Sequence, residues 1–372
     1  MGTEINNTLQ NLESPKPDLL IHGFDTIQCA YSMEQRRKGG IDFQFLREKK
    51  ESIRDLRNKE RVAVKIGGQD FLLHPYGTAS GYPILISNED FKIEMGEFNN
   101  PNFFVTFRSQ ALWRESAFEL HHRFIGWAKS VGYEPLGSES LSRIDYCFDY
   151  NLSEIDFDED CFVSRSSKDS KHREDGKVQT FTFGKGDVVL RVYDKVAEIK
   201  QQSDKAWFYE LWGGLIEDVW RIEWQVRKEI LRDHGIKTFN DLYNRLGDLL
   251  KYLSEEHDTL RQPDGDSNRS RWPLHPLWKD LQERVKFINQ EETRKPYDKE
   301  VVLDERMMRI AISVYGYLKR VAAIRCFEEG KDIISAEEAL ENLCERMWKV
   351  HDPFNWKIDV KKRIEAIGCG EW

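Results

Sequence analysis

The sequence predicts an α+β fold in which an antiparallel β-sheet is flanked by helices and followed by a helical appendage. Two observations lead to this prediction. Three segments in the middle of the chain alternate apolar and polar residues with the period of two that is typical of half-buried strands. Beyond Glu292, by contrast, the apolar residues recur at helical spacing and the alternation is absent.

Length and composition exclude several classes of protein. The chain has 372 residues, of which 40% are apolar and 12% aromatic, enough for a large core and for about two domains. No window approaches the run of about 20 apolar residues that spans a membrane, and residues 1–17 lack the features of a signal peptide. The six cysteines form no C-x-x-C pair, which favours reduced thiols over disulfides or structural zinc. We therefore expect a soluble, cytoplasmic protein without a membrane partner.

The net charge of -9 argues against a general nucleic-acid binder, because such proteins usually carry a basic excess. A sum over the whole chain does not describe any one face, however. The distribution of the charges therefore decides the question.

The pattern along the chain divides it into a polar lead-in, a main body of three parts and a helical C-terminal region. The lead-in, which is expected to be disordered, is 1–17; the main body, 18–290, has a β-rich part at 18–110, a central sheet at 115–235 and a helical part at 236–290; the C-terminal region is 291–372.

Local patterns predict the individual elements in order. Short alternating runs predict strands at 25–31, 61–74, 91–97 and 103–108, the second of them a pair around a glycine turn. A highly charged stretch and an amphipathic stretch predict helices at 35–58 and 115–131. The central strands are expected at 141–150, 188–193 and 220–228, with a polar, locally basic loop at 164–177. Later helices are expected at 239–260, 278–289, 303–329 and 335–350.

The three central strands carry unusual residues on their polar face. Alternation separates an apolar face from a face with these side chains: Asp145, Asp149, Arg191, Tyr193, Glu223 and Gln225. Open antiparallel sheets often keep one wet face, which is the simplest explanation of such a stripe. Carboxylates within apolar strands are costly, however, unless they are paired or bound to a metal ion. Two acids with one amide suit Mg²⁺ or Mn²⁺.

A tyrosine beside such an ion suits a covalent phosphotyrosyl step, since the ion would lower the pKa of the phenol and polarise a phosphodiester. Nearby Arg191, Lys195 and Arg221 could hold the phosphate or the charge that develops on it.

Three short blocks occur in a fixed order along the central strands. They are RIDYCFDY at 143–150, VLRVYDKVAE at 189–198 and RIEWQVR at 221–227. Their order, RxDxxxD, LRxYxK and RxExQ, resembles the replication initiation factor family, which includes rolling-circle plasmid and phage replication initiators and related conjugative-element relaxases, atypical HUH-type nucleases. The resemblance covers roughly residues 18–282 and implies a replication-initiator-like nuclease sheet.

The resemblance implies a DNA endonuclease and strand transferase. Such a protein nicks one strand at an origin through a metal-assisted tyrosine, leaving a covalent 5′-phosphotyrosine and a free 3′-hydroxyl primer. Carried over block by block, Tyr193 would be the nucleophile, with Lys195 and Arg191 as phosphate-orienting groups. The implied ligands of Mg²⁺ or Mn²⁺ are Asp145 and Glu223, with Gln225 beside them and Asp149 in reserve. The His-apolar-His motif of the wider superfamily is absent from this sequence.

The predicted partner is DNA, as an origin or transfer-origin hairpin that is single-stranded at the nick site. The residues expected to contact it are Arg165, Lys168, Lys171, Arg173, Arg221 and Arg227. A homodimer and a contact with a host helicase are further expectations. The role of the helical C-terminal region is left open between origin recognition, dimerisation and helicase contact.

Two other functions fit the same residues. The first is a non-catalytic DNA-binding or phage regulatory protein that keeps the sheet without using the tyrosine. The second is a metal-dependent phosphodiester hydrolase that uses Asp145, Asp149 and Glu223 with water and forms no covalent intermediate.

Overall fold

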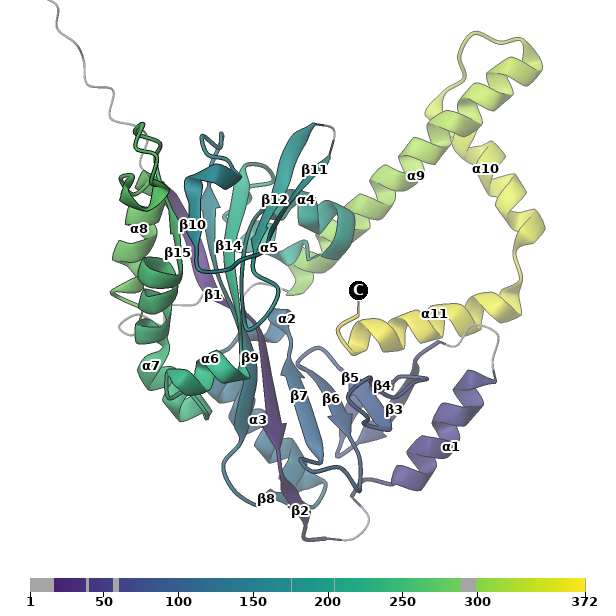
Figure 1. The fold of residues 1–372 in the computed structure, drawn as a ribbon. Helices are drawn as coiled ribbons and strands as arrows, with labels where there is room; N and C mark the ends of the chain where they lie inside the picture. The colour runs from purple at the N-terminus through teal and green to yellow at the C-terminus, as the bar shows by residue number, and fades with distance from the viewer. Residues whose placement is uncertain are drawn as a thin grey trace, which may run out of the picture.

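The computed structural model of the chain describes residues 17–37, 40–55, 60–174, 176–203, 205–288 and 299–371. It contains a large β-sheet with helices on both faces and a C-terminal part of three long helices that returns to the sheet (Figure 1). The α+β class predicted from the sequence is therefore confirmed. The predicted lead-in lies outside the described residues except for Pro17.

Within the described residues, eleven strands form one sheet whose neighbouring strands are all antiparallel. In spatial order they are β11 (Asp169–Glu174), β12 (Lys177–Phe183), β13 (Val188–Asp194), β14 (Val219–Arg227), β9 (Ser140–Asn151), β1 (Asp18–Tyr31), β7 (Phe103–Phe107), β6 (Phe91–Met95), β5 (Ile84–Ser87), β4 (Gln69–Leu73) and β3 (Val62–Ile66). Two short pairs stand apart from this sheet: β2 (Met33–Gln35) with β8 (Tyr133–Pro135), and β10 (Phe162–Ser164) with β15 (Asp258–Leu260).

Strand β1 joins the β-rich part and the central sheet, which the sequence treats as separate parts. It is 14 residues long and pairs with β9 along one edge and with β7 along the other. The two parts are therefore halves of one continuous sheet.

The helices are α1 (Phe43–Arg54), α2 (Ser109–Leu112), α3 (Ala117–Ser130), α4 (Lys195–Glu198), α5 (Trp207–Leu211), α6 (Lys228–Asp233), α7 (Phe239–Tyr252), α8 (Pro276–Val285), α9 (Lys299–Glu329), α10 (Ala336–Val350) and α11 (Pro353–Gly368). Short 3-10 or π turns occupy Glu159–Cys161, Ile199–Ser203, Leu253–His257 and Arg269–Arg271. Local chemistry fixes several helix starts. Ser116 and Glu119 form a capping box before α3, and Thr238 with Asp241 form one before α7.

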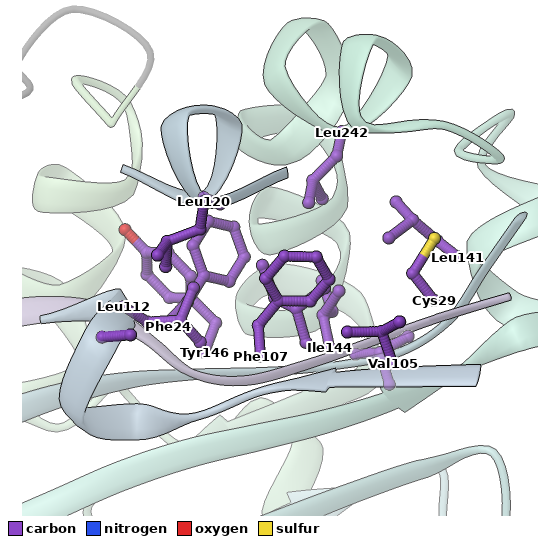
Figure 2. Packing of buried hydrophobic residues seen from close by; sticks show 14 of the residues in the cluster. Phe24, Cys29, Val105, Phe107, Leu112, Leu120, Leu141, Ile144, Tyr146 and Leu242 are labelled. Atoms are coloured by element: carbon purple, nitrogen blue, oxygen red, sulfur yellow. The ribbon is translucent and has the colours of Figure 1, made fainter. Parts of the chain in front are cut away.

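One face of the sheet carries the main hydrophobic core. Strand residues such as Phe107, Ile144 and Tyr146 point toward Leu120 of α3 and Leu242 of α7, and all five are buried (Figure 2). Helices α6, α7 and α8 lie on this side of the sheet (Figure 1). The apolar side of the alternation predicted for the central strands is therefore the core side.

The opposite face carries a smaller apolar cluster that covers only one end of the central strands. It contains Trp113 after α2, Val196 of α4 and the aromatic residues of α5, packed around Cys147 of β9. The polar side chains of β13, β14 and β9 lie on this face beside the cluster, which partly shields them from water.

Several local predictions differ from the structure. The helix expected at 239–260 ends earlier, since Asp258–Leu260 form strand β15. The polar loop expected at 164–177 forms part of the β11–β12 hairpin, whose residues alternate too weakly to signal a strand because β11 is an exposed edge. Strand β5 lies in a short apolar run and was not predicted. The charged helix expected at 35–58 is shorter in the structure, where α1 covers Phe43–Arg54. Asp42 is its N-cap residue, and the Asp42 side chain accepts a hydrogen bond from Phe45 N.

The three C-terminal helices confirm the helical appendage and leave many apolar side chains exposed. Phe327 of α9 is 91% exposed and Trp348 of α10 is 71% exposed. The end of α11 returns to β3, where Lys362 pairs with Glu60 at 3.0 Å. None of the described helices is both long and apolar enough to cross a lipid bilayer.

Phe107 tests the core of the sheet. Its ring is fully buried and meets the rings of Phe91 and Phe239 edge-on, with centroids 5.5 and 5.3 Å away. Phe107→Ala should lower the free energy of unfolding by about 3–5 kcal/mol, because it removes a buried ring and leaves a cavity. Urea denaturation followed by circular dichroism measures this. The control is Phe98→Ala, whose ring is 96% exposed and whose removal should change stability by less than about 0.5 kcal/mol.

Candidate active site

Strand register brings the predicted residues of three sequence blocks onto one face of the sheet. Tyr193 of β13 is the register partner of Arg221 of β14, which in turn faces Asp149 of β9. The next two rows toward the other end contain Arg191 with Glu223, and then Gln225 with Asp145. Partners in antiparallel strands point to the same face, so these side chains are neighbours.

Tyr193 and Glu223 form the centre of the site. The phenol of Tyr193 donates a hydrogen bond to Glu223 Oε2 at 3.0 Å, and Arg191 Nη1 donates to Glu223 Oε1 at 3.1 Å. Arg191 Nη2 also donates to Gln225 Oε1 at 3.4 Å. Tyr193 and Glu223 are buried, whereas the Arg191 side chain is 37% exposed. The arginine therefore lies between the buried pair and solvent.

The pKa of Tyr193 is raised well above its usual value, first by burial and then by the negative charge of Glu223. The phenol is therefore protonated in this arrangement, and its proton already faces a carboxylate oxygen.

Asp145 lies one row away and is held by an arginine that was not among the predicted site residues. Arg143 donates to both carboxylate oxygens, through Nε at 2.7 Å and through Nη2. Burial raises the pKa of Asp145 to about 6; Arg143 opposes this rise, and the charge of Glu223 adds to it. The ionised form of Asp145 is thus less favourable in the folded protein than in water, although it still predominates at pH 7.

Asp149, the predicted reserve ligand, is committed to another role. It is fully buried, and both of its oxygens accept from Arg221, at 2.6 and 2.8 Å. Trp212 Nε1 adds a third hydrogen bond at 2.9 Å. Its lone pairs are therefore already used by an ion pair within the protein.

Arg221 differs from its predicted role as a DNA contact. Its side chain is 0% exposed, and beyond Asp149 it donates to Asp25 Oδ1 at 2.9 Å. Its guanidinium also lies over the ring of Phe208, 4.3 Å from the centroid. A guanidinium with these partners is buried below the surface that DNA would meet.

Asp25 enters the site from a strand that the sequence did not connect with it. A register shift between Phe24 and Thr26 in β1 marks an irregularity at Asp25. Ser109 and Lys205 donate to its carboxylate, at 2.8 and 3.0 Å. The nearby charges of Lys205 and Arg221 hold the pKa of Asp25 well below its usual range despite burial.

Lys195, predicted to orient phosphate, points into the protein. Asp194 caps α4 by accepting from Ala197 N, so Lys195 begins a helix directly after the strand. Its side chain is 1% exposed, and Nζ donates to Glu198 at 2.6 Å and lies 5.0 Å from the centroid of Phe208. Burial lowers its pKa. Nζ also lies 5.6 Å from the centroid of the Tyr193 ring, so the buried lysine stays next to the predicted nucleophile.

The other predicted DNA contacts lie at the surface but not together. Lys168, Lys171 and Arg173 belong to the β11 hairpin region at the sheet edge, where Lys171 pairs with Glu159. Arg165 is 56% exposed and pairs with Glu256. Arg227 is exposed at the end of β14 and is the register partner of Arg143. Arg227 is therefore on the site face, in the row next to Asp145.

His172 is a further residue that the sequence placed in a loop. Its register partner is Thr180, which is itself the partner of Tyr193. His172 is exposed and stands two strands from the tyrosine, roughly 10 Å away at about 4.8 Å per strand. Only the formation of the β11–β12 hairpin reveals this alignment.

The donor set fits the divalent cation that the sequence implies. Asp145, Glu223 and Gln225 supply two carboxylates and one amide oxygen, and Glu223 and Asp145 are near enough for one charge to raise the pKa of the other. A cation between them would remove that repulsion. The described residues contain no group of three or more His, Cys, Asp or Glu side chains that could hold a metal ion, and the third donor here is an amide.

Comparison with known proteins gives one neighbour to describe. No protein-family model and no curated protein sequence matches the chain. Among solved structures, the chain is similar to a rolling circle replication initiator protein from Geobacillus stearothermophilus. The sequences are 17% identical, the TM-score is 0.41, and the match covers 71% of this chain and 96% of that chain.

The two acids of β9 should respond differently to replacement by asparagine. Asp149→Asn should lower the free energy of unfolding by about 3 kcal/mol, because it leaves the buried Arg221 with an incomplete partner. Asp145→Asn should change it by less than about 1 kcal/mol at pH 7, because the ionised Asp145 is already disfavoured by burial. Urea denaturation of both variants measures the contrast. Equal losses would show that the two carboxylates play the same structural role.

Proposed function

We propose that the protein is a metal-dependent, tyrosine-type DNA endonuclease and strand transferase that nicks one strand at an origin of rolling-circle replication or DNA transfer. The observation that supports this most is the hydrogen bond from Tyr193 to Glu223, at the point where the three sequence blocks meet. The Oη atom of Tyr193 attacks the phosphorus of a phosphodiester. The P–O3′ bond breaks, which leaves a 5′-phosphotyrosine and a free 3′-hydroxyl.

Glu223 receives the proton that Tyr193 loses in this step. Its Oε2 atom is within hydrogen-bond distance of the phenol, which is the geometry that a general base needs. The leaving 3′-oxygen takes its proton from water.

Asp145, Glu223 and Gln225 would hold Mg²⁺ or Mn²⁺. When bound, the ion supplies positive charge that polarises the phosphodiester and favours the ionised phenol. Asp145 would have to exchange its pairing with Arg143 for this role, and Glu223 would exchange its pairing with Arg191. Both arginines are partly exposed, at 24% and 37%, so they can turn toward a phosphate without crossing the core.

The arginines on the site face bind and orient the scissile phosphate in this proposal. Arg191 lies beside the tyrosine row, while Arg143 and Arg227 form the row beyond Asp145. Guanidinium groups match the planar geometry of phosphate oxygens and stabilise charge that develops on them. They take the place that the sequence assigned to Arg221 and Lys195.

The substrate is a single strand, exposed at the nick site within an origin or transfer-origin hairpin. The reacting side chains are buried or half-buried on the sheet face, and a duplex does not present its backbone to so recessed a group. The net charge of -9 disfavours tight binding to random duplex. Recognition therefore depends on DNA structure and on the metal ion.

The nucleophile is tested by trapping its covalent product. Wild-type protein incubated with single-stranded origin oligonucleotide and Mn²⁺ should form an adduct that survives denaturation, and EDTA should abolish it. Tyr193→Phe should form none, because the attacking oxygen is gone. Tyr243→Phe, which changes a 63% exposed tyrosine on the far side of the sheet, is the matched control and should behave like wild type.

The other outcomes separate the alternatives. An adduct that survives Tyr193→Phe refutes the nucleophile, cleavage without any adduct favours the metal-dependent hydrolase, and DNA binding without cleavage favours the regulatory protein. Glu223→Gln should reduce single-turnover cleavage by at least about a hundredfold, since it removes both the proton acceptor and a ligand. Thermal melting of the variant checks that the fold is kept.

A further inference from the structure

A cavity of about 540 Å³ opens on the same face of the sheet, beside the candidate active site. Its floor includes Thr26 of β1, the register partner of Asp145, and Thr106 of β7. Its walls come from α2, from the segment that precedes α5, and from the C-terminal end of the chain. The volume is in the range of pockets that hold small ligands or parts of larger ones.

The cavity is basic, although the protein as a whole is acidic. Among the described residues that line it, four are basic and one is acidic: Lys92, Arg108, Lys205 and Arg306 against Glu371. The Lys92 side chain is 43% exposed, and its one ion pair, with Glu94, is loose at 3.9 Å. Lys205 is already paired with Asp25 at 3.0 Å, so the other charged lining residues leave an excess of two positive charges. In a chain of net charge -9, this local excess favours an anion.

The neighbouring His74 responds to the same positive charges. Burial lowers its pKa to about 4, and after burial the charges of Arg61, Lys92 and Arg108 contribute to this. The pKa of Arg108 is itself lowered, first by burial, while Glu371 opposes this effect.

A row of polar side chains connects the cavity with the active site. Arg227, Arg143, Gln28, Thr106 and Lys92 are successive register partners across β14, β9, β1, β7 and β6. Gln28 Nε2 donates to Thr106 Oγ1 at 3.4 Å. From Arg143 to Lys92 the row crosses three strand spacings, roughly 14 Å at about 4.8 Å each. That span is enough for more than one nucleotide.

We propose that this cavity is a second phosphate-binding site, which holds the backbone of single-stranded DNA that continues from the active site. Lys92 and Arg108 contact the phosphates, and the polar row supplies hydrogen bonds to the strand on the way. Glu371 lies in the same cavity, where it pairs with Arg61 and opposes an incoming phosphate. The continuity of the strand with Tyr193 rests on the proposed function, whereas phosphate binding in the cavity does not.

Fluorescence anisotropy with a labelled single-stranded oligodeoxynucleotide tests the cavity in EDTA, where no cleavage occurs. Lys92→Gln with Arg108→Gln should weaken binding by about tenfold at low salt and reduce the slope of log Kd against log salt by about 1.4, or about 0.7 per phosphate contact. Glu371→Gln should tighten binding about threefold. Lys251→Gln, on the exposed side of α7 across the sheet, is the matched control and should not change it.

Lys92→Gln alone keeps the test valid if the double variant does not fold, because the Lys92 side chain is 43% exposed and its ion pair with Glu94 is loose, at 3.9 Å. Unchanged oligonucleotide binding in both variants would overturn the proposal. It would also be overturned if the variants lost the binding of dAMP, a mononucleotide probe, and still bound the oligonucleotide as tightly as wild type. The adduct experiment is independent of this result. If binding depends on Lys92 and no adduct forms, the cavity stands and the tyrosine mechanism fails.

Discussion

The face of the sheet that carries the candidate site depends on the ion pairs of the buried Arg221 guanidinium with Asp149 and Asp25. A positive charge with no exposure to water is tolerated only when carboxylates neutralise it and every donor finds an acceptor. Asp149 of β9 and Asp25 of β1 provide that neutralisation, and the Trp212 indole completes the coordination of Asp149. One arginine thus fixes the relative positions of three strands and of the aromatic segment packed over them. Tyr193 is the register partner of this arginine, so the same network helps to hold Tyr193 beside Glu223.

The network also explains why neighbouring acids have different properties. Asp149 faces a guanidinium with both oxygens, so its charge is compensated within the fold. Asp145 and Glu223 lie close to each other, and their arginine partners are only partly buried. Burial and the charge of Glu223 therefore raise the pKa of Asp145. Folding alone therefore leaves these two carboxylates less completely compensated than Asp149. A site that is under-compensated in the free protein is suited to gain a cation or to exchange arginine partners when a phosphate arrives.

The sequence predicts the faces of the sheet better than the order of its strands. Period-two alternation correctly put Tyr193 and Glu223 on one face, because alternation is a local property of each strand. It could not show that β1 lies next to β9, so Asp25 and its irregular register went unnoticed. For a related reason, the alternation does not show the burial of the Lys195 side chain. The strand ends at Asp194, and the direction of the next side chain is set by packing against Phe208 and not by the strand period.

Charge distribution reconciles an acidic protein with a phosphate substrate. Binding to random duplex draws on the field of the whole surface, and here that field is repulsive. The positive groups of the site face instead lie along the row from Arg227 to Lys92 and in the cavity at the Lys92 end of that row. A flexible single strand can follow such a row and place successive phosphates on it, whereas a stiff duplex would also bring its second backbone against the acidic surroundings. In the proposed function, the overall negative charge would act as a filter, since it would remove the general affinity for DNA and leave only the affinity that depends on matching this row.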